Sequence, residues 1–287
     1  MKKSFKLFLL ALCAVFACLA FTGCSSPTTT PEPSTPVTPE PSTPVTPEPP
    51  VTYIGTKTPT ETKAVGDIVF TDGSASPYND ELTDEQKAAA IAVIFYVGDE
   101  NDTLGAKTLG VGLKEEQKKW CLWEASAGPI NSKTVDTILC IPTGEDGAYI
   151  FDEDADKDGS DNLEQISQWL KDNDIEDDTS KESNYPAFYF AKNYKTTASN
   201  VSSTSYEYGW YIPSLAELFE LWKQISTVNA VINGCAEQII KGLYLSSSED
   251  PAYSTVYILY INTAWFNGRY STCNKDSEYT VRAIHTF

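Results

Sequence analysis

Histidine is almost absent from this 287-residue chain, which contains a single one, His285. One histidine cannot supply the Ser-His, Cys-His or multi-histidine zinc arrangements on which many hydrolases and metalloenzymes depend. The sequence also lacks the G-x-S-x-G elbow, the phosphate-binding P-loop and the G-x-G-x-x-G dinucleotide fingerprint. These absences exclude the common nucleophilic, histidine–zinc and nucleotide-binding enzyme classes.

Positively charged residues are also scarce. The chain has 21 lysines and arginines against 40 aspartates and glutamates, which gives a net charge of −19. Such a chain is repelled by nucleic acids and by anionic membrane surfaces, so we expect no nucleic-acid partner. Carboxylates are abundant, but nothing in their order along the chain marks a glycosidase pair.

The amino terminus has the three parts of a secretory signal. Three lysines within the first six residues precede an apolar run over residues 7–21, which is too short for a mature transmembrane span. The run ends in Phe21-Thr22-Gly23-Cys24, a small residue before a cysteine, as lipoprotein processing requires. We expect residues 1–24 to be a lipoprotein signal peptide; an ordinary signal peptide cut near Cys24 is the alternative.

Acylation of Cys24 would supply the two chains that stable anchoring needs. The lipid membrane is then one partner, and the expected location is the outer-membrane surface. Cleavage of the leader removes three lysines and no acidic residue, so the mature charge is 18 − 40 = −22.

Residues 25–52 are rich in proline and threonine. The octapeptide PEPSTPVT covers residues 31–38, recurs at 39–46 and starts again at Pro47. Proline at this density removes backbone donors and restricts φ, which excludes helix and sheet and favours extended polyproline II. At about 3 Å per residue the segment spans at most roughly 80 Å. We expect a stalk that lifts a domain from the lipid surface; a linker without a length requirement is the alternative.

Residues 53–287 are enough for one large domain. Helices are indicated by capping boxes at Thr83 and Ser214 and by apolar residues at 3–4 spacing, and strands by short β-branched and aromatic runs. This pattern predicts an α+β domain. The expected strands are 66–70, 92–97 and 109–113, the expected helices start at 83, 163, 186 and 213, and residues 243–287 form an irregular, β-rich end.

Of the seven cysteines, four remain in the mature chain besides the anchor Cys24, namely Cys121, Cys140, Cys235 and Cys273. An exported location permits disulfides, but their wide spacing does not determine a pairing. We favour free buried thiols over a Cys121–Cys140 disulfide.

An acidic loop partly matches a calcium-binding loop. Asp154, Asp156, Asp158 and Gly159 occupy the first, third, fifth and sixth positions of such a loop, but its last position is Gln165 instead of a glutamate. Calcium is therefore the one cofactor that we consider. The alternative is a solvated acidic loop that caps the next helix.

Three segments near the carboxyl end form an ordered pattern: G-W-Y-I-P-S-L-A-E-L at 209–218, Y-L-S-S-S-E at 244–249 and Y-T-V-R-A-I at 279–284. The pattern resembles that of bacterial domains related to the formylglycine-generating enzyme. Gly159, Asn162 and residues 185–188 resemble parts of the amino half of the same domains. The resemblance implies a C-type-lectin-like fold over residues 53–287.

Within that family, a lipoprotein whose variable end closes the chain resembles the spirochaete variable proteins of diversity-generating retroelements. There, substitutions at adenines, chiefly in Asn codons, diversify a ligand-binding surface, which here corresponds to about residues 246–287. The implied variable residues are Tyr253, Ser254, Thr255, Tyr257, Tyr260, Asn262, Thr263, Ala264, Phe266, Asn267, Arg269, Tyr270, Thr272 and Cys273. Tyrosine, serine and asparagine suit adaptable recognition. The alternative is a β-rich end whose aromatic residues pack inward.

Other residues are implied to be constant. An AAC or AAT codon altered at its adenines cannot become Trp, Lys or Glu, so Trp265, Lys275 and Glu278 would belong to the framework. Trp210, Pro213 and Arg282 join them as residues of the shared pattern.

The same resemblance also bears on catalysis. The oxidase relatives use two closely spaced cysteines near this end, whereas here Cys273 stands alone and Cys235 is 273 − 235 = 38 residues away. We therefore expect a monomeric ligand-binding protein and not an enzyme, with a protein or glycan ligand. A non-diversified adhesion or scaffold lipoprotein is the alternative, and an oxidase of the formylglycine-generating type comes third.

Overall fold

The computed structural model describes residues 51–79, 81–122, 133–251 and 255–287. Residues 50–287 form one compact unit by their contacts. Cys24, the expected signal peptide and stalk residues 25–50 lie outside the described residues, as do Tyr253 and Ser254. In the part of the chain that is described, no helix has the length and apolar character to cross a membrane.

Eight strands form one mixed sheet, in the order β2-β1-β3-β4-β10-β7-β8-β9. Only the β10–β7 pair is parallel, and the other neighbours are antiparallel. The strands are β1 (Asp67–Phe70), β2 (Ala75–Pro77), β3 (Ala90–Val97), β4 (Thr108–Lys119), β7 (Gly242–Asp250), β8 (Thr255–Ile261), β9 (Tyr270–Asn274) and β10 (Glu278–Thr286). A separate hairpin pairs β5 (Pro142–Glu145) with β6 (Ala148–Phe151).

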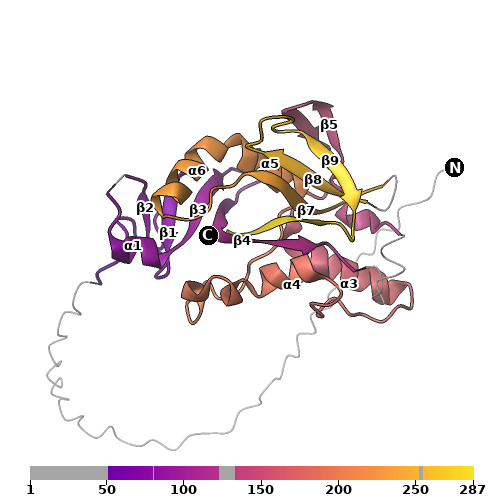
Figure 1. The fold of residues 1–287 in the computed structure, drawn as a ribbon, viewed down its shortest axis with the longest axis horizontal. Coiled ribbons are helices and arrows are strands. Elements are labelled where there is room, and N and C mark those ends of the chain that lie inside the picture. The colour runs from indigo at the N-terminus through magenta and orange to yellow at the C-terminus, as the bar shows by residue number, and fades with distance from the viewer. Residues whose placement is uncertain (1–50, 80, 123–132, 252–254) are drawn as a thin grey trace, which may run out of the picture. The chain divides into compact units, whose positions relative to one another are not determined.

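The carboxy-terminal strand lies in the middle of this sheet (Figure 1). β10 runs antiparallel to β4 from the pair Glu278 and Lys119 to the pair Thr286 and Leu109. On its other edge β10 meets β7. The last strand therefore joins the amino-terminal strands to the β7–β8–β9 group.

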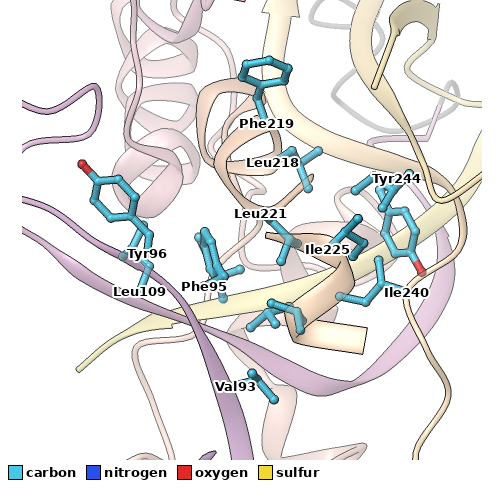
Figure 2. Packing of buried hydrophobic residues seen from close by; sticks show 14 of the residues in the cluster. Val93, Phe95, Tyr96, Leu109, Leu218, Phe219, Leu221, Ile225, Ile240 and Tyr244 are labelled. Atoms are coloured by element: carbon cyan, nitrogen blue, oxygen red, sulfur yellow. The ribbon is translucent and has the colours of Figure 1, made fainter. Parts of the chain in front are cut away.

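Helices cover both faces of the sheet, which is why β3 is an almost continuous apolar run. Val93 and Phe95 pack in one core cluster, and Ala92 and Ile94 pack in the other. Figure 2 shows Phe95 in the first cluster with Leu218, Leu221 and Ile225. The helices are α1 (Asp84–Ala89), α3 (Asn162–Asp172), α4 (Pro186–Lys192), α5 (Leu215–Lys223) and α6 (Ile225–Gly234), with 3-10 turns η1 (Asp136–Ile138), η2 (Gly159–Asp161), η3 (Tyr194–Thr196) and η4 (Ser199–Val201).

Local signals in the sequence are confirmed in most elements. Both predicted capping boxes form, at Thr83 with Gln86 and at Ser214 with Glu217. The α+β class and the free buried cysteines are also confirmed. The helix predicted from 213 is instead two helices that break at Gln224, and the β5–β6 hairpin was not predicted.

Candidate ligand-binding face

The first patterned segment forms a buried polar centre at the start of α5. The Glu217 carboxylate is fully buried and accepts hydrogen bonds from the backbone N–H of Ser214 (2.8 Å), the N–H of Gly159 (3.0 Å) and the hydroxyl of Tyr211 (2.9 Å). Burial raises the pKa of Glu217 to about 7. This glutamate therefore ties the α5 terminus to the loop before α3.

The three serines of β7 join the same centre, and all are fully buried. Ser248 Oγ accepts from the Leu215 N–H at 3.0 Å, and Ser246 Oγ donates to the Tyr257 carbonyl at 2.9 Å. The Ser247 hydroxyl and the Asn162 amide lie 2.8 Å apart. The three serine hydroxyls are thus used in hydrogen bonds inside the fold and do not face a ligand.

The arginine of the third segment is likewise internal. Arg282 is 1% exposed and forms an ion pair with Glu115 at 2.7 Å. Arg282 also donates to the Gly112 and Gln238 carbonyls. Trp210 and Pro213 are buried as well, so these three residues lie where framework residues are expected.

The β8–β9 connection, residues 262–269, is the exposed part of the carboxyl end. Trp265 is 79% exposed and Phe266 is 56% exposed. Asn267 holds the loop, because its Oδ1 accepts from the Asn262 N–H at 2.7 Å and from the Trp222 Nε1 at 3.1 Å. The loop therefore presents two aromatic rings to solvent on an ordered backbone.

The turn of the β5–β6 hairpin lies beside this loop. Arg269 forms an ion pair with Asp146 at 2.7 Å, and the Tyr149 hydroxyl donates to the same carboxylate at 2.7 Å. The rings of Tyr149 and Tyr270 are 5.0 Å apart at a steep angle. Figure 1 shows β5 and β9 together at one end of the domain.

Sequence reasoning missed Asp146, Tyr149 and Trp222. The turn Gly144-Glu145-Asp146-Gly147, which is typical of a hairpin, was the available signal.

A hollow of about 220 Å³ lies in this surface and is lined by Tyr260, Phe266, Arg269, Tyr270 and Ser271. The Arg269 guanidinium lies 5.2 Å from the centre of the Phe266 ring, and the Tyr260 ring is 5.7 Å from Phe266. Ring faces, a cation and a hydroxyl are therefore available together. Such a lining binds a side chain or a small ring through stacking and a few polar contacts.

The implied variable residues divide by exposure. Tyr257 (3% exposed) and Cys273 (8%) are buried, so their expected place on the contact face is corrected. Tyr257 lies in the core with its ring 5.6 Å from that of the exposed Tyr270, and burial together with Asp250 raises its pKa. The exposed residues are Asn262, Ala264, Phe266, Asn267, Arg269, Tyr270 and Thr272, and the half-buried ones are Thr255, Tyr260 and Thr263.

Trp265 was predicted to be constant, and it lies at the surface: it is the most exposed large hydrophobic side chain among the described residues. Lys275, by contrast, is fully buried against Glu249 at 2.7 Å, and its ammonium lies 4.9 Å from the centre of the Trp120 ring.

The acidic loop is used within the fold. Asp158 forms an ion pair with Lys107 and accepts the Ser160 N–H at 3.1 Å, which caps η2. Burial raises the pKa of Asp156 to about 7, and Asp154 is exposed. Across the described ranges, no group of three or more acidic, histidine or cysteine side chains is arranged to hold a metal ion. The match of Asp154, Asp156 and Asp158 to a calcium loop is therefore not accompanied by a ligand cluster.

The buried thiols are weak nucleophiles. Burial raises the pKa of Cys273 to about 12 and that of Cys235 to about 11, which keeps both protonated near neutral pH. The two belong to different core clusters.

No protein-family model and no curated protein matches the chain in comparisons with known proteins. Among solved structures, the chain is similar to a fimbrial protein from Bacteroides ovatus, with a TM-score of 0.51 and 18% sequence identity. The match covers 78% of this chain and 49% of that protein, so the chain spans about half of its length. The likeness concerns the fold: an α+β domain built on a large mixed sheet.

Proposed function

We propose that this protein is a lipid-anchored surface protein that binds a ligand through the β8–β9 loop and the adjoining β5–β6 turn. The observation that carries the proposal is the exposure of Trp265 and Phe266 on an ordered loop. Contiguous apolar patches that a soluble domain exposes mark interaction sites. The expected lipid on Cys24 would hold the protein at the membrane, and the proline-rich stalk would separate its domain from the lipid surface.

We further propose a C-type-lectin-like fold of the formylglycine-generating-enzyme type. The three patterned segments support this assignment because they meet in space. Glu217 of the first segment bonds to the loop before α3, and Ser247 and Ser248 of the second bond to Pro213 and Leu215 of the first. A shared pattern that forms one buried network is what a common framework requires.

Diversification by a retroelement is the third part of the proposal. Of the twelve implied variable residues that the structure describes, ten are exposed or half-buried, whereas Lys275 and Arg282 of the implied framework are buried in ion pairs. Substitution at the exposed loop changes contacts with little effect on the core. This distribution suits a surface that varies on a constant scaffold.

The ligand is a protein or a glycan, and the chain acts as a binder without chemistry of its own. The raised pKa values of Cys235 and Cys273 support this assignment, because neither thiol is activated as an oxidase would need.

The decisive experiment is to sequence the gene and its surroundings. A near-copy of the codons for about residues 246–287, differing at adenines and next to a reverse-transcriptase gene, is expected. Deep sequencing of a growing culture should find substitutions at the codons of Asn262, Phe266 and Asn267 and none at Trp265. Absence of both the copy and the variation would contradict diversification.

That outcome would leave the alternative, an adhesion or scaffold lipoprotein with an invariant face. One solved structure with a similar fold is that of a fimbrial protein. The likeness extends to the fold alone, so the binding face is the basis of either version.

A further inference from the structure

Two hairpin turns that are distant in sequence form one surface at this end of the domain. The β5–β6 turn, residues 145–147, contacts the β8–β9 loop through the Asp146–Arg269 pair. Trp222 of α5 joins them, since it bonds to Asn267 and lies against Gly268. We call this surface the two-turn face.

The backbone of the loop is strained where the aromatic rings project. Phe266 has φ +61° and Asn262 has φ +51°, both in the left-handed region. An asparagine tolerates that region, but a bulky aromatic residue rarely occupies it. Strain of this kind persists where the surrounding structure enforces it, and it concentrates at binding sites. The conformation that holds Phe266 and its neighbour Trp265 outward therefore costs the fold some stability.

The two-turn face carries more negative than positive charge. Glu145 is exposed beside Asp146, which pairs with Arg269, and Lys223 beside Trp222 pairs with Glu220, so these five charged residues sum to −1 − 1 + 1 + 1 − 1 = −1. Residues 51–287 contain 18 basic and 37 acidic residues, a net charge of 18 − 37 = −19. The field around the face is consequently negative, which attracts a positively charged partner and repels an anionic one.

We infer that the two-turn face docks a positively charged protein surface, with Trp265 inserted into it as the central contact. This inference rests on the proposed function and names the class of its ligand. The Trp265 side chain is 79% exposed, whereas the neighbouring hollow holds only about 220 Å³. We therefore expect Trp265 to enter a pocket of the partner, and not a partner side chain to fill the hollow. Tryptophan is enriched among the central, energetically dominant residues of protein–protein contacts.

A selection with random peptides tests this inference. The full-length protein, purified in detergent, is presented with a phage-displayed library of random dodecapeptides, and the pool retained by the Trp265→Ala variant is subtracted. The remaining peptides should carry a clear excess of lysine and arginine over the unselected library. Retained peptides of neutral or negative average charge would overturn the inference, as would the absence of any Trp265-dependent peptide.

Point variants then distinguish the contribution of the Trp265 ring from that of the charged residues, with the affinity for one enriched peptide as the measurement. Trp265→Ala should weaken binding by about tenfold or more, as expected for a central aromatic contact. Glu145→Gln should weaken it by about threefold, and Arg269→Gln should strengthen it by a similar factor because Asp146 is freed. A loss of affinity in Arg269→Gln would contradict the charge argument. Ile150→Ala is the matched control, because Ile150 is 66% exposed but alternates with Tyr149 on β6 and so points to the opposite side.

An oligosaccharide array distinguishes the two levels of the proposal. Oligosaccharides retained in a Trp265-dependent manner would overturn the protein-partner inference and leave the binding face in place. If neither peptides nor oligosaccharides respond to Trp265→Ala, Phe266→Ala or Tyr270→Ala, the proposed function itself fails.

Discussion

Two buried ion pairs connect the last residues of the chain to strands β7 and β4. Lys275 and Glu249 are both fully buried and 2.7 Å apart, and Lys275 also donates to the Lys133 carbonyl at 2.9 Å. Arg282 and Glu115 form the second pair. Because these charges are largely removed from water, each one is tolerated in the folded protein only as long as its partner is present.

Replacing one member of the Lys275–Glu249 pair should therefore lower the free energy of unfolding more than replacing both members. Lys275→Met leaves the Glu249 carboxylate buried without its cation and should lower the free energy of unfolding by about 3 kcal/mol. The double variant Lys275→Met with Glu249→Leu should recover most of that loss. Urea denaturation of the three proteins measures both effects, and a double variant no more stable than the single one would contradict the prediction.

The raised pKa of Glu217 makes stability depend on pH. Its pKa in the folded protein is about 7, above the ordinary 4.5, so the folded state binds more protons between these values. The free energy of unfolding should consequently fall as pH rises from 4.5 to about 7, by up to about 1.4 kcal/mol per pH unit from this group.

Glu217→Gln should flatten that dependence, because glutamine does not titrate. Unfolding in urea at pH 5, 6 and 7 measures the slope, and Glu85→Gln, at an exposed carboxylate of α1, serves as the control. An unchanged slope in Glu217→Gln would show that other groups, such as Asp156, produce the dependence.

At the level of elements, the β8–β9 loop depends on close contact with α5. A Cβ added at Gly268 would lie 2.3 Å from the Trp222 ring, and Gly268 has φ +79°. Gly105 has a similar φ of +74° with no atom within 4 Å of an added Cβ. The two glycines thus differ in contact and not in backbone conformation.

This pair isolates the effect of the contact. Gly105→Ala should lower the free energy of unfolding by about 1 kcal/mol through φ alone. Gly268→Ala should cost roughly 1 to 3 kcal/mol more, because overpacking forces Trp222 to move. Thermal unfolding measures the difference, and equal losses would mean that the loop and α5 are not in contact in solution.

At the level of the whole molecule, location depends on one cysteine. Cys24→Ser should abolish incorporation of radiolabelled palmitate and move the protein from the membrane fraction to the soluble fraction, because acyl chains supply the anchoring energy. Cys13→Ser and Cys18→Ser should leave both unchanged, since Leu12 directly precedes Cys13 and the bulky Phe16 stands two residues before Cys18. Palmitate labelling that survives Cys24→Ser would contradict the assigned site.

Much of the fold follows from short-range patterns, whereas the face does not. The capping boxes at Thr83 and Ser214 and the apolar run of β3 are local, and each formed as predicted. The side-by-side placement of Asp146 and Arg269 joins residues 123 positions apart (269 − 146), and no local signal announces it. Tyr257 and Tyr270 are of one residue type in one region, yet the first is buried and the second is exposed.

The sequence by itself determines the features that depend on neighbours along the chain: helix caps, strand periodicity and negative charge. It also predicts the leader and the stalk. Only the tertiary structure decided which aromatic residues face the core and which face solvent. That decision depends on strand register, since β8 lies between β7 and β9 and a shift of one residue would reverse its faces. Tyr257 was expected on the contact face and is buried, because strand register and long-range packing set the burial of a strand residue.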